Sequence, residues 1–155
     1  MEKIEFAPIA YVSNDRDHLE DDDWGDVVSE IRLRDDLSPE LLRGLDSFSH
    51  VEVIFVFHRI PASKKVPDLR HPRNNQAWPK LGLLAQRSSY HPNPIGLCTA
   101  KVLRVDGRVL IVQGLDAVDG SPILDIKPVF REFLPVDTKQ PQWVSELLIN
   151  YWRKS

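Results

Sequence analysis

Polar side chains that could bind a ligand or do chemistry gather in one short stretch of the chain, between Gly82 and Cys98. After an apolar start that is typical of the end of a buried strand, this stretch carries Arg87, Ser88, Ser89, Tyr90, His91 and Asn93. Pro92 and Pro94 fix their own φ angles, favour extended conformations for the residues before them, and remove two backbone donors. We therefore expect a stiff loop outside the interior of a sheet, which is typical of a functional site. The alternative is a rigid turn with a solvated surface.

Several well-known chemical sites find little support in the sequence. No Gly-x-Gly-x-x-Gly and no Walker motif indicates a Rossmann or P-loop nucleotide site. The histidines lack the spacing of zinc ligands, although a metal-dependent hydrolase built on His50, His58 and His91 is one alternative. Ser88, His91 and Asp119 could form a nucleophilic set, but no Gly-x-Ser-x-Gly elbow supports one.

The elements that must position these residues are mainly short strands. Apolar runs and alternating patterns predict strands at 4–12, 27–34, 51–57, 99–105 and 108–114, of which 51–57 is central. Asp106-Gly107 predicts a two-residue hairpin between the last two. Ser38-Pro39-Glu40 predicts the start of a short helix, and Gln140-Pro141 opens a C-terminal helix over about 140–154. The pattern is typical of one mainly β domain, closed into a barrel over residues 1–155 with its core at about 5–137.

Composition and charge narrow the class of protein. The 155 residues carry a net charge of −3, one cysteine, no apolar run of membrane-helix length and no signal-peptide pattern, so we expect a cytoplasmic location. Acids are concentrated at 15–26 and bases at 59–87. The prolines, bases and Trp78 of 61–79 predict a long flap that faces a substrate. Two solvated loops of opposite charge are the alternative.

Three ordered blocks carry a family resemblance. They are Gly44-Leu45-Asp46-Ser47-Phe48-Ser49-His50 through Phe57-His58-Arg59, then Arg87-Ser88 with Pro92-Asn93-Pro94-Ile95-Gly96-Leu97, then the run LDAVDGSPILDIKP over 115–128. Together they resemble the TsaA-like (TrmO-type, YaeB-like) family over roughly residues 5–137. The resemblance implies a non-Rossmann β-barrel methyltransferase that uses S-adenosylmethionine. It also implies tRNA as partner, with the N6 region of threonylcarbamoyladenosine, next to the anticodon, as the first acceptor to test.

Methyl transfer asks little of the protein, because the sulfonium methyl group is already activated. The protein must align donor and acceptor and exclude water. Asp116 or Asp119 could bind the amino group of the cofactor, and the planar fork of Arg87 suits its carboxylate. Leu97 and Leu115 could line an adenine slot. The alternatives are a module that binds S-adenosylmethionine without transferring its methyl group, and a methyltransferase with a non-tRNA acceptor.

The resemblance also implies individual site residues. Cofactor-binding positions carried over from the family are His58, Arg59, Arg87, Leu97, Asp116, Ala117, Val118 and Asp119, with Asp22, Asp23 and Trp24 in the N-terminal loop. We assign the substrate-facing positions to Tyr90, His91, Asn93 and Lys127, and we assign no general base and no metal ligand. The sequence departs from the family pattern at His91, where arginine is usual, and at Val129, where tyrosine is usual. Structural alternatives are His58 capping a strand and Asp119 shaping a turn.

The C-terminal helix predicts association between copies of the chain. It carries Trp143, Leu147, Leu148, Tyr151 and Trp152, more large apolar surface than one helix face buries on its own barrel. We therefore expect a homodimer whose cofactor pocket is close to the interface or shared across it, which the resemblance also implies. The alternative is a helix that plugs one end of the barrel.

Overall fold

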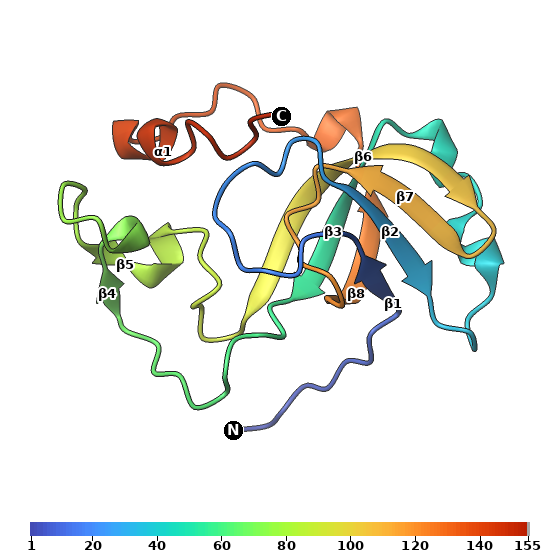
Figure 1. Ribbon diagram of the computed structural model, residues 1–155, viewed down its shortest axis with the longest axis horizontal. Coiled ribbons are helices and arrows are strands. Elements are labelled where there is room, and N and C mark those ends of the chain that lie inside the picture. The colour runs from blue at the N-terminus through green and yellow to red at the C-terminus, as the bar shows by residue number, and fades with distance from the viewer. Residues whose placement is uncertain (155) are drawn as a thin grey trace.

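Antiparallel strands close into a six-stranded barrel in the computed structural model, which describes residues 1–154 (Figure 1). Around the barrel the order is β1, β2, β7, β6, β3, β8 and back to β1. The strands are β1 (Ala10–Ser13), β2 (Val28–Leu33), β3 (His50–Val56), β6 (Ile95–Asp106), β7 (Val109–Gln113) and β8 (Pro122–Pro128). The predicted fold, mainly β and closed into a barrel, is confirmed.

Alternating side chains fill the interior of the barrel. In β2 and β3 every second residue is buried, and these residues are Ser29, Ile31, Leu33, Val51, Val53 and Phe55. Gly96 in β6 faces the ring of Phe55, and a Cβ atom at this glycine would lie 2.3 Å from that ring. The ring of Phe55, the largest core side chain of β3, therefore occupies the space that a side chain at Gly96 on β6 would need.

The elements with the clearest sequence patterns lie where they were predicted. β3 is central in the chain's pairing, hydrogen-bonded to β6 on one side and β8 on the other. β6 and β7 form the predicted hairpin, and Gly107 in its turn has φ +59°. The predicted helix at Ser38 is a 3₁₀ helix, η1 (Pro39–Leu42), whose Glu40 amide donates to the Ser38 hydroxyl at 3.2 Å. A second 3₁₀ turn, η2 (Leu45–Ser47), follows.

Two predicted boundaries are wrong, and one strand was not predicted. The first strand begins only at Ala10, because that is where pairing with β2 and β8 begins, and Ile4 and Phe6 are left exposed. β6 starts at Ile95, directly after Pro94, and not at Thr99, so the last four residues of the Gly82–Cys98 stretch form a strand paired with β3, while the polar residues 87–93 precede it. β8, which the sequence did not reveal as a strand, runs between Pro122 and Pro128 and closes the barrel.

The flap and the C-terminal segment also differ from expectation. The only α-helix in residues 1–154 is α1 (Gln142–Leu147), far shorter than the predicted helix over about 140–154. The flap has secondary structure and extends past the predicted range of 61–79. β4 (Leu69–Arg70) pairs with β5 (Leu81–Gly82), with η3 (Pro72–Asn74) between them and η4 (Leu83–Ala85) after them. η5 (Arg131–Phe133) follows β8. No helix within residues 1–154 is long and apolar enough to cross a membrane.

The connections that carry the predicted site all leave one end of the barrel, called here the loop end. Because neighbouring strands are antiparallel, the segments after β1, β3 and β7 and before β2, β6 and β8 meet there. These are residues 14–27, 57–94 and 114–121. In Figure 1 the flap projects to the left of the barrel, with α1 above it. The Trp78 indole joins these two parts by donating to Glu146 Oε2 at 2.8 Å.

Candidate functional site

Asp116 is the chemical centre of the loop end. Its Oδ2 accepts a hydrogen bond from the Tyr151 hydroxyl at 2.5 Å. Its Oδ1 is buried and has no hydrogen-bond partner among residues 1–154. A buried acceptor without a partner is costly, since it has lost water and gained nothing in return. Such an atom indicates a place where a ligand donor binds.

The thiol of Cys98 lies beside this carboxyl group. It donates to the Gly114 carbonyl at 3.3 Å, and burial, followed by the charge of Asp116, raises the pKa of Cys98 far above its usual range. The charge of Arg87 acts in the opposite direction and is the smallest of these influences on the pKa of Cys98. A thiol that stays protonated is a poor nucleophile, so this pKa does not favour Cys98 as a nucleophile, and its side chain packs in the barrel core.

Arg87 approaches the cluster from the polar stretch. Its Nη2 donates to the backbone carbonyl of Leu97. The Leu97 side chain points out of the barrel and is 45% exposed. Arg87 itself is exposed, and no carboxylate within the described residues forms an ion pair with it. The predicted arginine and leucine therefore lie together, with the guanidinium charge free for an anionic group.

Asp119 has a structural task that the sequence left open. Its Oδ1 accepts from the Asn14 backbone amide at 3.1 Å, and its own amide donates to the Arg16 carbonyl at 2.8 Å. The Asn14 side chain also donates to the Ala117 carbonyl at 2.9 Å. These bonds fix the 116–119 turn to the N-terminal loop, so one oxygen of Asp119 is already engaged.

The N-terminal loop packs against the same turn through Trp24. This residue is 3% exposed and forms a small apolar cluster with Val27 and Val118. The guanidinium of Arg16 lies 4.1 Å above the Trp24 ring and donates to the carbonyls of Asp22 and Asp23. Its Nε is buried without a hydrogen-bond partner in the part of the chain that the structure describes. A second polar atom near the turn is thus left for a ligand.

The two predicted aspartates of this loop brace it from outside. Arg73 in η3 donates to Asp22 Oδ1 at 2.9 Å. Arg153 donates to both carboxyl oxygens of Asp23, at 2.7 and 3.1 Å, and these bonds lower the pKa of Asp23. Asp22 and Asp23 therefore position the loop, and their carboxylates are occupied by arginines of this chain.

His58 and Arg59, which follow β3, reach the turn from the other side. Arg59 donates to the backbone carbonyls of Asp17 and, at 3.5 Å, of Asp119. The His58 Nε2 would lie 3.6 Å from a Cβ atom built on Gly120. The three predicted groups, after β3, before β6 and in the 115–119 turn, are therefore brought together at the loop end.

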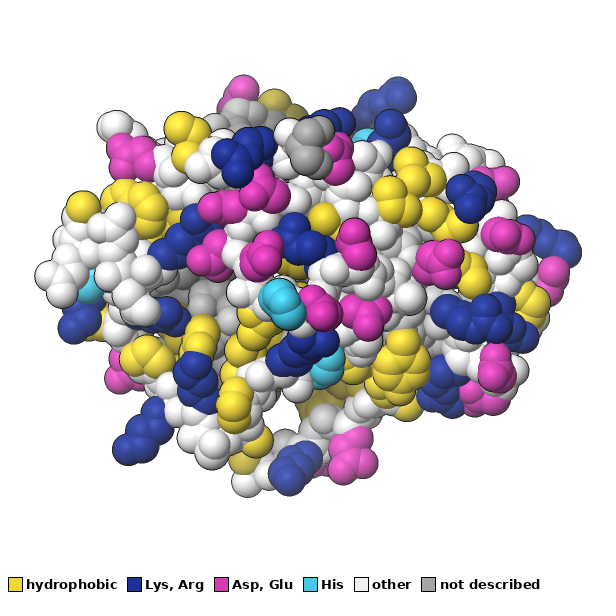
Figure 2. Space-filling view, viewed as in Figure 1, with side chains coloured by type: hydrophobic (Ala, Val, Ile, Leu, Met, Phe, Trp, Pro, Cys, Tyr) yellow, Lys and Arg dark blue, Asp and Glu magenta, His cyan; other side chains and the backbone are white. Residues whose placement is uncertain are grey.

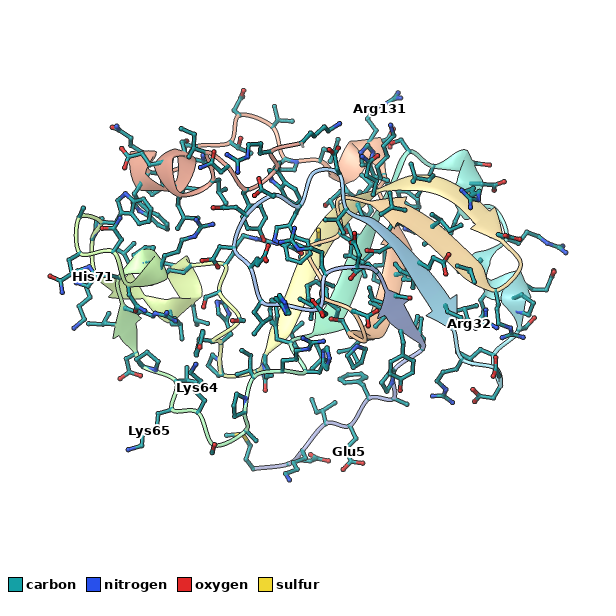
Figure 3. The ribbon with its side chains drawn as sticks, viewed as in Figure 1. Glu5, Arg32, Lys64, Lys65, His71 and Arg131 are labelled. Carbon is teal, nitrogen blue, oxygen red and sulfur yellow. The ribbon has the colours of Figure 1, made fainter. Side chains whose placement is uncertain are left out.

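Tyr90, His91 and Asn93 lie at the base of the flap. His91 Nε2 donates to the Gln86 carbonyl at 2.7 Å, while Asn93 is exposed. Tyr90 lines two adjoining hollows of about 330 and 300 Å³, the first of which is walled by Lys64, Lys65, Pro67, Arg70 and Asn74. No acid lines this first hollow. Figure 3 shows Lys64 and Lys65 at the outer edge of the flap.

Lys127 does not join the other predicted substrate residues. It pairs with Glu52 in the sheet, four residues along β3 from the partner of Ile95, which is roughly 13 Å at 3.3 Å per residue. Its ammonium group forms an ion pair with Asp125 at 2.8 Å on the outside of the barrel.

The alternative chemistries lose support from the geometry. No group of three or more His, Cys, Asp or Glu side chains in residues 1–154 is placed to hold a metal ion. Ser88, His91 and Asp119 show no hydrogen bond to one another: Ser88 accepts from the Tyr90 amide, His91 donates to the Gln86 carbonyl, and Asp119 accepts from the Asn14 amide. The residues that the sequence analysis missed are Asn14, Arg16, Cys98 and Tyr151. For Asn14 a signal existed, the turn-forming Ser13-Asn14-Asp15.

Comparisons with known proteins match most of this chain. The model of the tRNA-methyltransferase O N-terminal domain matches residues 22–133. A human tRNA (adenine(37)-N6)-methyltransferase is 39% identical over 122 residues, 78% of this chain and 26% of the relative. A probable S-adenosyl-L-methionine-binding protein of Methanothermobacter thermautotrophicus is 40% identical over 89 residues, 57% of this chain and 61% of the relative.

Solved structures give the same result for the fold. A crystal structure of TrmO from P. aeruginosa superimposes with a TM-score of 0.71 and 25% identity, over 92% of this chain and 62% of that one. The chain thus spans about a quarter of the human relative's length and less than two thirds of the others. The matched residues include the flap, β6 and the 115–119 turn.

Proposed function

The chain belongs to the family of the tRNA-methyltransferase O N-terminal domain, and from this premise we propose that it transfers a methyl group from S-adenosylmethionine to N6 of an adenine in tRNA. The observation that carries the proposal is that one part of each of the family's three blocks, namely His58-Arg59, Arg87 with Leu97, and 115–119, lies at the loop end, where Asp116 Oδ1 is unpartnered. The activity in the name of the human relative supports the choice of base, adenine 37.

The donor set at the loop end fits the cofactor. A buried carboxylate oxygen, Asp116 Oδ1, suits the ammonium group of a methionine-type ligand, because an ammonium offers three donors. Arg16 Nε and the Arg87 guanidinium are donors that suit its carboxylate. Leu97 offers exposed apolar surface for the adenine ring. When bound, S-adenosylmethionine supplies an already activated methyl group.

The protein's own part in the reaction is positioning. The barrel and its braced loops hold the two substrates in line and exclude water, which is the main requirement of this transfer. We propose that His58, Arg59 and the 116–119 turn belong to the cofactor side of the site. Tyr90, His91, Asn93 and the basic hollow of the flap belong to the tRNA side. Lys127, on the barrel wall, could contact only a more distant part of the same tRNA.

We propose N6 of threonylcarbamoyladenosine as the methyl acceptor, and the cytoplasm, where tRNA is found, as the location. An assay with labelled S-adenosylmethionine and total tRNA tests the activity, with nuclease digestion and nucleoside analysis to identify the labelled base. Transfer to N6 of a position-37 adenosine is expected. Label in another nucleoside would refute the proposed acceptor, while the assignment as a tRNA methyltransferase would stand.

The second candidate is a module that binds S-adenosylmethionine without transferring its methyl group. The name of the Methanothermobacter relative favours it, since that name states binding alone. Both candidates require binding of the cofactor, which calorimetry with S-adenosylmethionine and S-adenosylhomocysteine measures. Binding without turnover on tRNA, nucleotides or protein would favour the module, and absence of binding would refute both.

A further inference from the structure

The last described residues of the chain lie against the site from outside the family domain. Residues 150–153, called here the C-terminal strap, follow α1 and lie beyond the segment 22–133 that the family model matches. The predicted helix ends at Leu147, after which the amides of Ile149 and Tyr151 bond three residues back, to Glu146 and Leu148, and the strap carbonyls then accept from the N-terminal loop. The Asp23 amide donates to the Asn150 carbonyl at 3.1 Å, and the Trp24 amide donates to the Tyr151 carbonyl at 2.8 Å.

The strap also contacts the other half of the site through side chains. The Tyr151 hydroxyl donates to Asp116 Oδ2, and the Trp152 ring lies against Gly114. Arg153 then returns to the N-terminal loop with its two hydrogen bonds to Asp23. Four successive residues therefore tie the N-terminal loop and the 114–116 segment to one another.

Gly25 shows how closely the strap approaches the loop. A Cβ atom on this glycine would lie 2.2 Å from the Trp152 carbonyl oxygen, which is backbone and cannot move aside alone. A side chain at position 25 is therefore incompatible with the strap in its present place. This close approach is a second observation, independent of the Tyr151 hydrogen bond, that the strap packs against the loops of the site.

Tyr151 has the properties of a permanent donor. Burial, and then the neighbouring Asp116, raise the pKa of Tyr151 far above its usual range. The hydroxyl consequently keeps its proton throughout the neutral range and is a donor to Oδ2 there. Only Oδ1 of the carboxyl group is left for another donor.

We propose that the strap completes the cofactor site, with Tyr151 as a positioning residue that aims Asp116 Oδ1 at an ammonium group of the ligand. This inference rests on the proposed function for the identity of the ligand, S-adenosylmethionine. The clamp between the N-terminal loop and the 114–116 segment is a property of the free protein.

The first test measures cofactor affinity. Tyr151→Phe keeps the ring and removes the hydrogen bond to a carboxylate, so we expect S-adenosylmethionine and S-adenosylhomocysteine to bind about tenfold more weakly by calorimetry. Tyr11→Phe removes an exposed hydroxyl on β1 and is the matched control, expected to be silent. In turnover, the KM for the cofactor should rise more than kcat falls. Unchanged affinity with a lower melting temperature would make Tyr151 a structural residue only, and tighter binding would make the strap a barrier.

The second test needs no ligand. Gly25→Ala should displace the strap, and hydrogen exchange of the Asp23 and Trp24 amides, which donate to strap carbonyls, should accelerate at least tenfold. Exchange as slow as in the parent protein would overturn the clamp. A parent protein that binds no S-adenosylmethionine would refute the proposed function, while the exchange result would still decide whether the strap holds the two segments together.

Discussion

At the scale of single residues, the site depends on polar atoms whose partners come from distant parts of the chain. Arg87 and Asp116 carry recognisable motif positions, and the sequence analysis placed both in the site. Tyr151 was assigned to an apolar helix face, because its neighbours suggested one and nothing near it in the sequence indicates a carboxylate. Cys98 and Arg16 likewise acquire their surroundings only when the barrel closes.

Asp116→Asn should weaken cofactor binding more than any other single-atom change at the loop end. The substitution keeps the shape of the side chain and removes the charge that would face an ammonium group. Loss of a buried charge-assisted contact typically costs about 2–3 kcal/mol, roughly two decades of affinity, measurable by calorimetry. Asp106→Asn, in the exposed turn at the other end of the barrel, is the control. Equal affinity in the parent and Asp116→Asn would remove Asp116 from the site.

Alkaline pH should destabilise the protein through Tyr151. Its pKa is raised in the folded state, so its contribution to stability is complete below the unfolded pKa of about 10 and is lost as pH rises above it. The free energy of unfolding should fall by up to about 1.4 kcal/mol per pH unit from this group alone. Urea unfolding between about pH 8 and 11 should show a shallower decline for Tyr151→Phe than for the parent. Parallel declines would contradict this assignment.

At the scale of elements, local pattern predicted the strands whose side chains alternate clearly or that meet at a recognisable turn. β2 and β3 alternate between buried and exposed residues, and β6 and β7 meet at Asp106-Gly107. β8 escaped prediction because its acids and prolines hide the alternation, and only pairing with β1 and β3 makes it a strand. The C-terminal helix was overestimated because its apolar residues continue beyond Leu147, where the backbone changes to three-residue turns and then bonds to the N-terminal loop.

The flap should contribute affinity for tRNA without affecting the cofactor. The ring of Tyr90 has Lys64 Nζ at 3.9 Å and the Arg70 guanidinium at 4.6 Å, so cations gather at one hollow. The double variant Lys64→Ala/Lys65→Ala should weaken tRNA binding and reduce the slope of log affinity against log salt by about 1.5. Cofactor affinity should stay at the parent value.

The matched control for the flap is Lys101→Ala/Lys139→Ala, which removes two exposed lysines outside the flap. Binding is measured by fluorescence with labelled tRNA at several concentrations of potassium chloride. Equal slopes for the two double variants would show that the flap lysines contact no phosphate.

At the scale of the whole molecule, the acidic and basic segments are not two independent solvated loops. The acidic loop and the flap meet through Arg73, which lies 2.9 Å from Asp22 and 3.8 Å from Asp21. Figure 2 shows acidic and basic side chains interleaved across the middle of the face that is turned to the viewer. Lys64, Lys65 and Arg70 have no carboxylate partner in residues 1–154, so the basic surface left for an anion is narrower than the sequence predicted.

A homodimer with the site near its interface is our expectation for the whole molecule. Two groups of exposed apolar side chains could serve as its interface, one at the loop end and one beyond the opposite end of β8. Ile149 and Trp152 at the loop end are 78% and 46% exposed, while Phe133 and Val136 after β8 are both 83% exposed. An interface beside the strap would bring the partner to the cofactor site, whereas one at Phe133 would keep it away.

Light scattering on the purified protein and two variants decides between these arrangements. The parent should have a mass of roughly twice 17.8 kDa at micromolar concentration. Ile149→Asp places a charge in the loop-end interface, so it should shift the mass toward the monomer and weaken cofactor binding together. Phe133→Asp should leave both unchanged. If Phe133→Asp alone dissociates the dimer, the interface lies at the opposite end and each subunit binds its cofactor without help from its partner; a monomeric parent protein would exclude a shared site altogether.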